Sequence, residues 1–310
     1  MNDTETIEAF AALFAGRTDA YGHNEGRMVP NAFGDTVEQG TRPHHMWITR
    51  HLVGLEPIGV YPLMDDGNVW WGCTDLDNGE DDLVHAKNLA TLLEAGGVNA
   101  WVERSRSKGF HVWTFASEPV PAETMRNALL AAHQRLGIPA KEVNPKQTSM
   151  DGLKGFGNYV RLPYPGVLNG EVGTRQVMLF TDDSVMPLYT FVHEAGRTRS
   201  NGWSYQKLAD KYTPPPPREN VYVDTEHSAE LDDIVSTMGK DLRCAFTYGP
   251  KGGHDRSSSL ARMAYLARED GLSASDAFMV MRDADRRWGK FFDRPDGDDQ
   301  LLKMIERAYG

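Results

Sequence analysis

The sequence predicts an α+β fold with a largely antiparallel sheet, followed by a small all-helical domain. In the N-terminal part of the chain the segments follow the order helix, hairpin, helix, hairpin, helix, strand, strand, which is typical of α+β domains. Beyond the four-proline run Pro214 to Pro217, apolar residues recur only at helical spacing. Such a run is stiff and extended, and it indicates a domain boundary.

Length and composition narrow the class of protein. The chain has 310 residues and a net charge of −11, so it suggests about two domains. The charge argues against bulk electrostatic coating of nucleic acid, but it does not exclude a local basic groove. No apolar run approaches the roughly 20 residues of a membrane span, and no secretion signal is recognisable. We therefore expect a cytoplasmic protein without membrane contact. Only two cysteines occur, Cys73 and Cys244, which argues against a disulfide framework and a cysteine zinc site.

The first elements follow from periodicity and turn residues. Helical spacing of apolar residues predicts a helix over residues 4–15, and the Gly-, Asn- and charge-rich stretch 16–42 indicates a loop. Strand-like runs at 59–63 and 69–74 flank an Asp-Gly pair, which favours a hairpin. Residues 83–96 have the pattern of a helix that ends at two glycines.

The next segments complete the first domain. Strands at residues 98–103 and 110–115 are expected to form a hairpin, and residues 121–136 a helix closed by a glycine. Short strands are expected at 141–144 and 158–163, and a last strand pair at 177–180 and Val192. Three apolar stripes beyond the prolines predict three helices, two of them opened by serine caps. We interpret these helices as a packing or linker module. The expected division is 1–213, a linker at 214–225, and a helical domain at 226–310.

Two aspartates end the second strand of the first predicted hairpin, in Trp70-Trp71-Gly72-Cys73-Thr74-Asp75-Leu76-Asp77. Side chains at i and i+2 share a face of a strand, so Asp75 and Asp77 are expected to point to the same place. Neighbouring carboxylates repel unless a cation lies between them, and Mg²⁺ is often bound by one or two carboxylates plus substrate phosphates. The alternative is a strand that ends in a solvated acidic turn, because residues 78–82 are also acidic.

A basic turn lies between the strands of the second hairpin. Residues 104–109 carry two serines, a glycine and three cations, so they offer N–H groups and positive charge to a phosphate chain. His111 follows just inside the next strand, where it could bind a phosphate oxygen or exchange a proton near neutral pH. The alternative for this segment is a solvated basic turn followed by a core histidine.

Other motifs carry less information. His44, His45 and His51 lack a further ligand at matching spacing, which favours surface or packed histidines over a metal site. No G-x-G-x-x-G follows a strand, and residues 249–254 lack the ending of a P-loop, which argues against an ATPase motor.

The acids and the basic turn fall on neighbouring strands of one predicted sheet. Glu142 and Lys146 add a further acid and a cation from a later strand. Two acids on one strand and a third on another can hold two metal ions for phosphoryl or nucleotidyl transfer. The basic turn and His111 would then hold a triphosphate.

Several sequence blocks together resemble the archaeo-eukaryotic primase superfamily, in particular the primase-polymerases of phages and mobile elements. The blocks keep the order of that family and are Gly59-Val60-Tyr61-Pro62-Leu63, Asp75-Leu76-Asp77, Glu103 to Trp113, Pro145-Lys146-Gln147 and Gly155 to Pro163. The segment that opens with Asp255-Arg256-Ser257-Ser258 is similar to the helical domain that follows the catalytic core in many such proteins.

The resemblance implies a two-metal nucleotidyltransferase that makes primers on a single-stranded DNA template and extends them. It implies two Mg²⁺ or Mn²⁺ ions, NTP or dNTP substrates, a replicative helicase acting in trans, and a phage or mobile-element protein in a bacterial host. Alternatives of the same fold are a gap-filling or repair polymerase that cannot prime, and an inactive single-strand-binding module for replication initiation. The intact acids argue against the inactive module.

The resemblance also assigns roles to residues. Asp75 and Asp77 match the metal-binding acids, and Glu142 is taken as the third because it is the only acid in its short strand, although some relatives have an aspartate at the position of Lys141. The residues implied in nucleotide binding are Ser105, Ser107, Lys108, His111, Lys146 and Arg161. Some relatives carry a cysteine-rich zinc element, which two cysteines cannot build.

Overall fold

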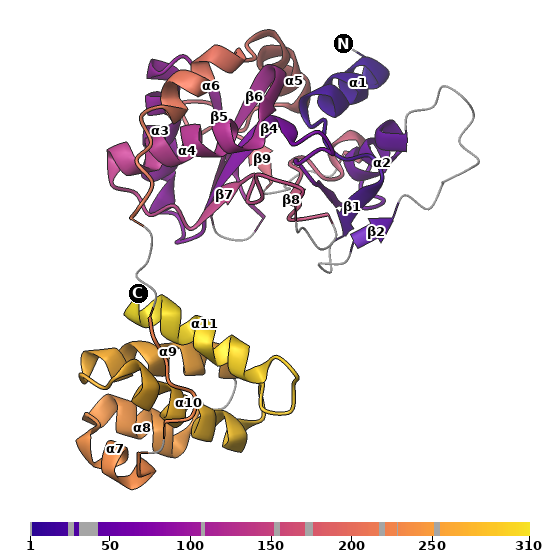
Figure 1. Ribbon diagram of the computed structural model, residues 1–310. Helices are drawn as coiled ribbons and strands as arrows, with labels where there is room; N and C mark the ends of the chain where they lie inside the picture. Colours follow the sequence, from indigo (N-terminus) through magenta and orange to yellow (C-terminus); the bar gives the residue numbers. More distant parts are fainter. Residues whose placement is uncertain are drawn as a thin grey trace. The chain divides into compact units, whose positions relative to one another are not determined.

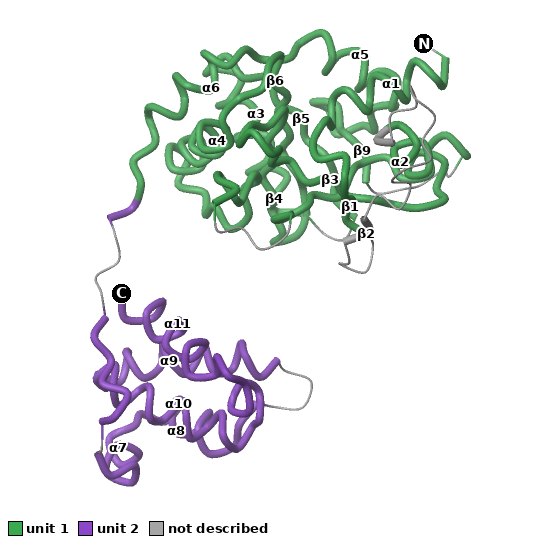
Figure 2. The backbone as a smooth tube through the Cα atoms, turned by 45° about the vertical axis from the view of Figure 1, so that its right-hand side comes forward, with its two compact units in different colours: residues 1–214 green, residues 215–310 purple. Residues whose placement is uncertain are grey.

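The computed structural model describes residues 2–23, 28–30, 43–106, 109–151, 156–170, 176–216, 221–227, 229–250 and 255–310. The chain divides into two compact units, Met1–Pro214 and Pro215–Gly310 (Figure 2). Each unit has its own hydrophobic core. The first unit is α+β with antiparallel sheets and the second is helical, which confirms the predicted fold class. Among the described helices, none combines the length and the apolar character that crossing a bilayer requires.

The first unit is built on a five-stranded central sheet. Its strand order is β7-β4-β6-β5-β9, and each neighbouring pair is antiparallel. Helices α3, α4 and α6 pack on one face of this sheet (Figure 1). The elements are β4 (Asn68–Leu76), β5 (Ala100–Arg104), β6 (Phe110–Pro121), β7 (Glu142–Asn144), β9 (Val177–Met178), α3 (Asp82–Ala95), α4 (Ala122–Leu136) and α6 (Gly202–Ala209).

The opposite face of the central sheet holds an aromatic core. Phe14, which follows α1 (Asp3–Leu13), meets the rings of Trp113 and Phe115 edge-on at centroid distances of 5.1 and 5.2 Å. Phe191 on α5 (Leu188–Arg197) packs against Phe115 at 5.9 Å. His111 precedes Trp113 by two residues on β6, and alternate residues of a strand share a face. His111 and its direct partner on β4, Asp75, therefore lie on the same face as this aromatic core.

A second, four-stranded sheet has the order β2-β1-β3-β8. It consists of β1 (Ala20–His23), β2 (Met28–Pro30), β3 (Ile58–Val60) and β8 (Val160–Arg161), and α2 (Pro43–Leu52) precedes β3. Two predictions are therefore wrong. The segment 16–42 contains two strands, and the run at 59–63 pairs with β1 and β8 instead of forming a hairpin with β4. The strand ends at Val60 because Pro62 has no N–H to continue a ladder.

The other predicted elements of this unit mostly agree with the structure. The hairpin of β5 and β6 forms, and α4 ends at Gly137, which has φ 66° in the left-handed region that glycine readily adopts. The exception is Val192, which was expected in a strand and lies on α5. Its buried neighbours at helical spacing pack against the aromatic core, so tertiary contacts decide the conformation here.

Among its described residues, the second unit contains the three predicted helices and two further ones. They are α7 (Leu231–Thr237), α8 (Lys240–Tyr248), α9 (Arg256–Glu269), α10 (Ala274–Trp288) and α11 (Gly297–Tyr309). Asp255 and Ser273 accept hydrogen bonds from backbone N–H groups at the starts of α9 and α10, which stabilises both helix ends. A separate cluster of apolar side chains forms the core of this unit.

Candidate active site

One row of side chains crosses the central sheet. Glu142 on β7 pairs with Asp75 on β4, Asp75 pairs with His111 on β6, and His111 pairs with Glu103 on β5. Side chains of directly opposed residues lie on one face, with Cβ atoms about 5 Å apart. The register therefore collects three carboxylates and an imidazole in a line, although the chain separates Glu103 from Glu142 by the whole of β6 and α4.

Asp77 extends this cluster beyond the end of β4. It follows Asp75 by two residues, is exposed, and lines the same cavity. The turn before β6 approaches it closely, because a Cβ on Gly109 would lie 2.1 Å from the carbonyl oxygen of Leu76. Only glycine allows this approach, and it brings the basic turn next to the two aspartates.

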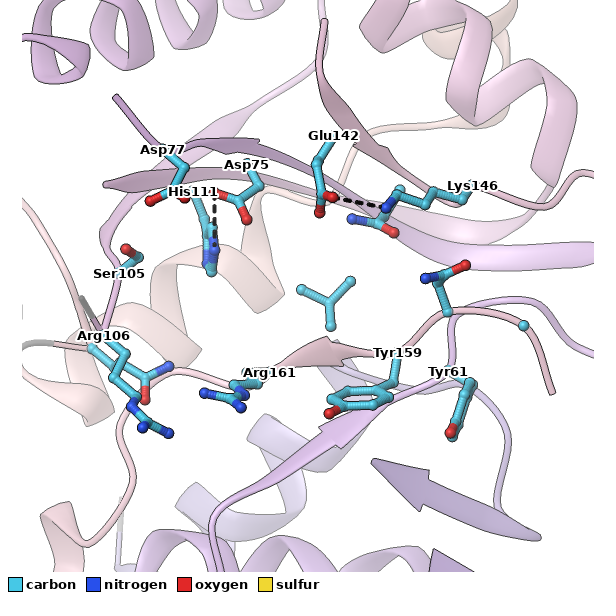
Figure 3. Close-up of a pocket in the computed structure, with 15 residues that line it drawn as sticks. Tyr61, Asp75, Asp77, Ser105, Arg106, His111, Glu142, Lys146, Tyr159 and Arg161 are labelled. Carbon is cyan, nitrogen blue, oxygen red and sulfur yellow. Dashed lines mark hydrogen bonds and ion pairs between the residues drawn. The ribbon is translucent and has the colours of Figure 1, made fainter. Parts of the chain in front are cut away.

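His111 is held from both sides by acids. Its Nδ1 lies 2.8 Å from Oε2 of Glu103, which is fully buried and also accepts a 2.5 Å bond from Nε1 of Trp113. Its Nε2 lies 3.6 Å from Oδ1 of Asp75 (Figure 3). Burial alone would lower the pKa of His111, but the charges and hydrogen bonds of Glu103 and Asp75 raise it to about 10. At neutral pH the ring is therefore a cation beside Asp75.

An ion pair holds the side chain of Glu142, and a residue of α4 holds the backbone that follows it. Lys146 Nζ lies 2.9 Å from Oε1 of Glu142. Arg126 on α4 donates to the carbonyl oxygens of Val143 and Pro145, at 2.5 and 2.9 Å. The guanidinium thus ties β7 and the following segment to α4. This arrangement sets the position of Glu142 opposite Asp75.

A cavity of about 590 Å³ opens over the cross-strand row, a size suited to a small organic ligand. Both sheets of the first unit contribute to it: the acids come from the central sheet, and Arg161 comes from β8 on the other side (Figure 3). Its lining is mostly polar and consists of Tyr61, Asp75, Asp77, Ser105, Arg106, His111, Glu142, Asn144, Lys146, Gly157, Asn158, Tyr159, Val160, Arg161 and Gln176.

Seven of the nine site residues predicted from sequence line this one cavity, namely Asp75, Asp77, Glu142, Ser105, His111, Lys146 and Arg161. The other two, Ser107 and Lys108, lie outside the described residues. Ser105 also closes the basic turn, since its Oγ accepts a 3.1 Å bond from the N–H of Gly109. Of the other turn cations, Arg106 lines the cavity, whereas Arg104 pairs with Glu80 at 3.0 Å.

The donor set suits a hard divalent cation that also uses substrate oxygens. Asp75 and Asp77 offer carboxylates to the same cavity, and Lys146 already neutralises Glu142. Within the described ranges, no group of three or more His, Cys, Asp or Glu side chains forms a ready ligand set. Mg²⁺ commonly binds through one or two carboxylates and the phosphates of its substrate, so two aspartates fit such an ion.

Sequence reasoning did not assign a role to some residues of the site. They are Glu103, which holds His111, and the cavity residues Tyr61, Asn144, Tyr159 and Gln176. The sequence holds a signal for Glu103, since Glu103 and His111 each lie four residues from position 107, the centre of the 105–109 turn between the paired residues Arg104 and Phe110. Partners across a hairpin follow from such symmetry. Tyr159 and Gln176 reach the cavity through long-range packing, which local patterns do not reveal.

The sequence match to a family is consistent with this geometry. The model of the archaeo-eukaryotic primase domain of TOTE conflict systems matches residues 36–193, just over half of the chain. The chain belongs to this family. Its matched region contains the cross-strand row and every residue that lines the cavity. Primases of this type typically use divalent metal ions, which agrees with the donor set of this primase domain.

Comparison with solved structures finds distant likenesses, including the two that follow. The polymerase domain of ligase D from Mycobacterium tuberculosis, in complex with DNA, is 15% identical with a TM-score of 0.34; the match covers 67% of this chain and 86% of that chain. The primase RepB′ is 14% identical with a TM-score of 0.29, and the match covers 99% of this chain and 94% of that chain. Comparison with curated proteins finds no match. The family assignment therefore rests on the sequence match.

Proposed function

We propose that this primase-family protein is a DNA-dependent primase-polymerase. It makes primers on single-stranded DNA from NTPs or dNTPs and extends them, and it works alongside a replicative helicase acting in trans. The observation that supports this function best is that Glu142, Asp75 and His111 of the cross-strand row line a cavity together with Asp77 and Arg161. Carboxylates and cations meet there, as nucleotidyl transfer requires.

The acids and the cations have separate tasks in this proposal. Asp75 and Asp77 would hold two Mg²⁺ or Mn²⁺ ions together with the substrate phosphates, and Glu142 is the third acid of the set. Such ions, when bound, stabilise the charge on the attacking and leaving oxygens. His111 donates from Nε2 to a phosphate oxygen while Glu103 holds its Nδ1. Arg161 and Arg106 offer further positive charge, and with Ser105, Ser107, Lys108 and Lys146 they are the proposed nucleotide-binding residues.

The test is synthesis on a circular single-stranded DNA without primer, with Mg²⁺ or Mn²⁺ and either NTPs or dNTPs. The wild-type protein is expected to give short products. Asp77→Asn should give none while the protein stays folded, because the variant keeps the shape of the side chain but loses its charge. Asp81→Asn is the matched control, since Asp81 is exposed and does not line the cavity. His111→Ala should raise the KM for nucleotide.

Two other activities predict different results. A gap-filling or repair polymerase extends an annealed primer but gives no product on the unprimed circle. An inactive single-strand-binding module gives neither product and shows no metal-dependent nucleotide binding by calorimetry. Full activity of Asp77→Asn would rule out the proposed metal site.

A further inference from the structure

Tyr159 occupies the wall of the cavity that faces the acids. It lies directly before β8, two residues before Arg161, and both side chains line the cavity. Side chains two residues apart in an extended chain lie on the same face, roughly 6 to 7 Å apart. This distance is comparable to the separation of phosphate and base within one nucleotide.

The back of the Tyr159 ring rests on two glycines. Gly22 of β1 and Gly59 of β3 are direct cross-strand partners. A Cβ atom on Gly22 would lie 2.2 Å from Cδ2 and Cγ of Tyr159, and one on Gly59 would lie 2.3 Å from Cδ2. Any side chain at either position would therefore push the ring into the cavity. The pair of glycines makes a flat floor that sets the plane of the ring.

Neighbouring rings hold Tyr159 from the side. Tyr61 meets it nearly edge-on, with a centroid distance of 5.6 Å and an interplanar angle of 71°. Phe156 packs on Tyr61 at 5.9 Å, and the guanidinium of Arg17 lies 4.8 Å from the centroid of Phe156. Arg17 is itself fixed by an ion pair with Asp65 at 2.6 Å. The ring is thus positioned before any ligand binds.

The front of the ring faces the open part of the cavity. Figure 3 shows it nearly edge-on, across the cavity from Glu142 and Lys146, with Arg161 beside it. An aromatic face held in this way is a stacking surface that accepts any base, because every base has a π-face. We propose that Tyr159 is the platform on which the base of the incoming nucleoside triphosphate stacks, while Arg161 contacts its phosphates. This inference rests on the proposed function.

The test compares a ligand that carries a nucleoside with one that offers only the phosphate chain. Equilibrium binding of a nucleoside triphosphate and of inorganic tripolyphosphate is measured with Mn²⁺ and without template, for the wild type and for Tyr159→Leu. The variant should bind the nucleoside triphosphate roughly tenfold more weakly, with a similar loss for all four bases. Its affinity for tripolyphosphate should not change, which also shows that the variant is folded. Tyr159→Phe keeps the ring and should recover most of the lost affinity.

Control variants and contrary outcomes separate the possibilities. Tyr189→Leu removes an exposed ring outside the cavity and should alter neither affinity. His111→Ala should reduce the affinity for both the nucleoside triphosphate and tripolyphosphate. The platform is overturned if Tyr159→Leu reduces the affinity for both ligands equally or for neither of them. It is also overturned if, in a separate binding measurement, the variant loses affinity only for single-stranded DNA, which would make Tyr159 a template contact. A wild-type protein that binds neither ligand would overturn the proposed function and the platform with it.

Discussion

Oε2 of Glu103 lies 2.8 Å from Nδ1 of His111, and the carboxylate is completely buried. Its other oxygen, Oε1, has no hydrogen-bond partner in the described part of the chain. A buried charge is costly unless it is paired. The imidazolium of His111 supplies the positive charge that pairs with the Glu103 carboxylate. The acid in turn leaves Nε2 of His111 directed toward Asp75 and the cavity.

This pair predicts the effect of Glu103→Gln. The variant keeps the size of the side chain but loses the charge-assisted bond to His111, so tripolyphosphate should bind roughly tenfold more weakly. Affinity is measured for Glu103→Gln, for His111→Ala and for the double variant. If Glu103 acts through His111, the double variant is no weaker than His111→Ala alone. Additive losses would instead mean that Glu103 affects binding independently of His111, and an unchanged affinity of Glu103→Gln would mean that Glu103 only stabilises the fold.

Glu142→Gln tests the third acid. Glu142 lies opposite Asp75 and is paired with Lys146, so a metal ion has to compete with a partly exposed ion pair worth up to about 1 kcal/mol. If Glu142 is a ligand, the variant needs a several-fold higher Mn²⁺ concentration for half-maximal synthesis. The measurement is a metal titration at saturating nucleotide. An unchanged titration curve would leave the metal to Asp75, Asp77 and the substrate phosphates.

His51 predicts a pH dependence of stability. Nε2 of this buried ring lies 2.8 Å from the carbonyl oxygen of Pro163, and Nδ1 accepts the N–H of Ile58 at 3.2 Å. Burial lowers the pKa of His51 to about 4, against the opposing effect of the Pro163 carbonyl. Below pH 6.5 the unfolded chain therefore takes up a proton that the folded chain does not. The free energy of unfolding should fall by about 3 kcal/mol on this account between pH 6.5 and 4.

The matched variant for this effect is His51→Gln, whose amide can also donate and accept but does not titrate. Urea unfolding of the wild type and the variant is compared from pH 7 to pH 4. The stability difference between them should shift in favour of the variant as the pH falls. Parallel curves would contradict the assignment, because the carboxylates common to both proteins titrate equally.

A truncation after Pro214 tests the domain organisation. The two apolar cores share no residue, so we predict that residues 1–214 fold alone and retain nucleotide binding. The truncated protein should show the melting transition of the first unit at an unchanged temperature. A loss of that transition would mean that the helical unit stabilises the primase domain.

Local sequence patterns predicted the elements that depend on neighbouring residues. Apolar periodicity and glycine stops indicated α3 and α4, and the turn at 104–109 indicated the hairpin of β5 and β6. The alternation of side chains along a strand also predicted that the side chains of Asp75 and Asp77 point in the same direction, and both line the cavity. These features are determined by backbone geometry over a few residues.

The partners of each strand were decided only by the tertiary structure. The Asp-Gly turn after β3 favoured a hairpin with β4, yet β3 pairs with β1 and β8, and this pairing sets Gly22 beside Gly59 beneath Tyr159. Register between distant segments depends on which faces bury the most apolar surface, and local patterns do not encode it. By itself the sequence determined which chemical groups are present and the family they suggest. The folded sheets determined that Glu103 holds His111 and that Tyr159 faces the acids, because both arrangements join residues through long-range packing.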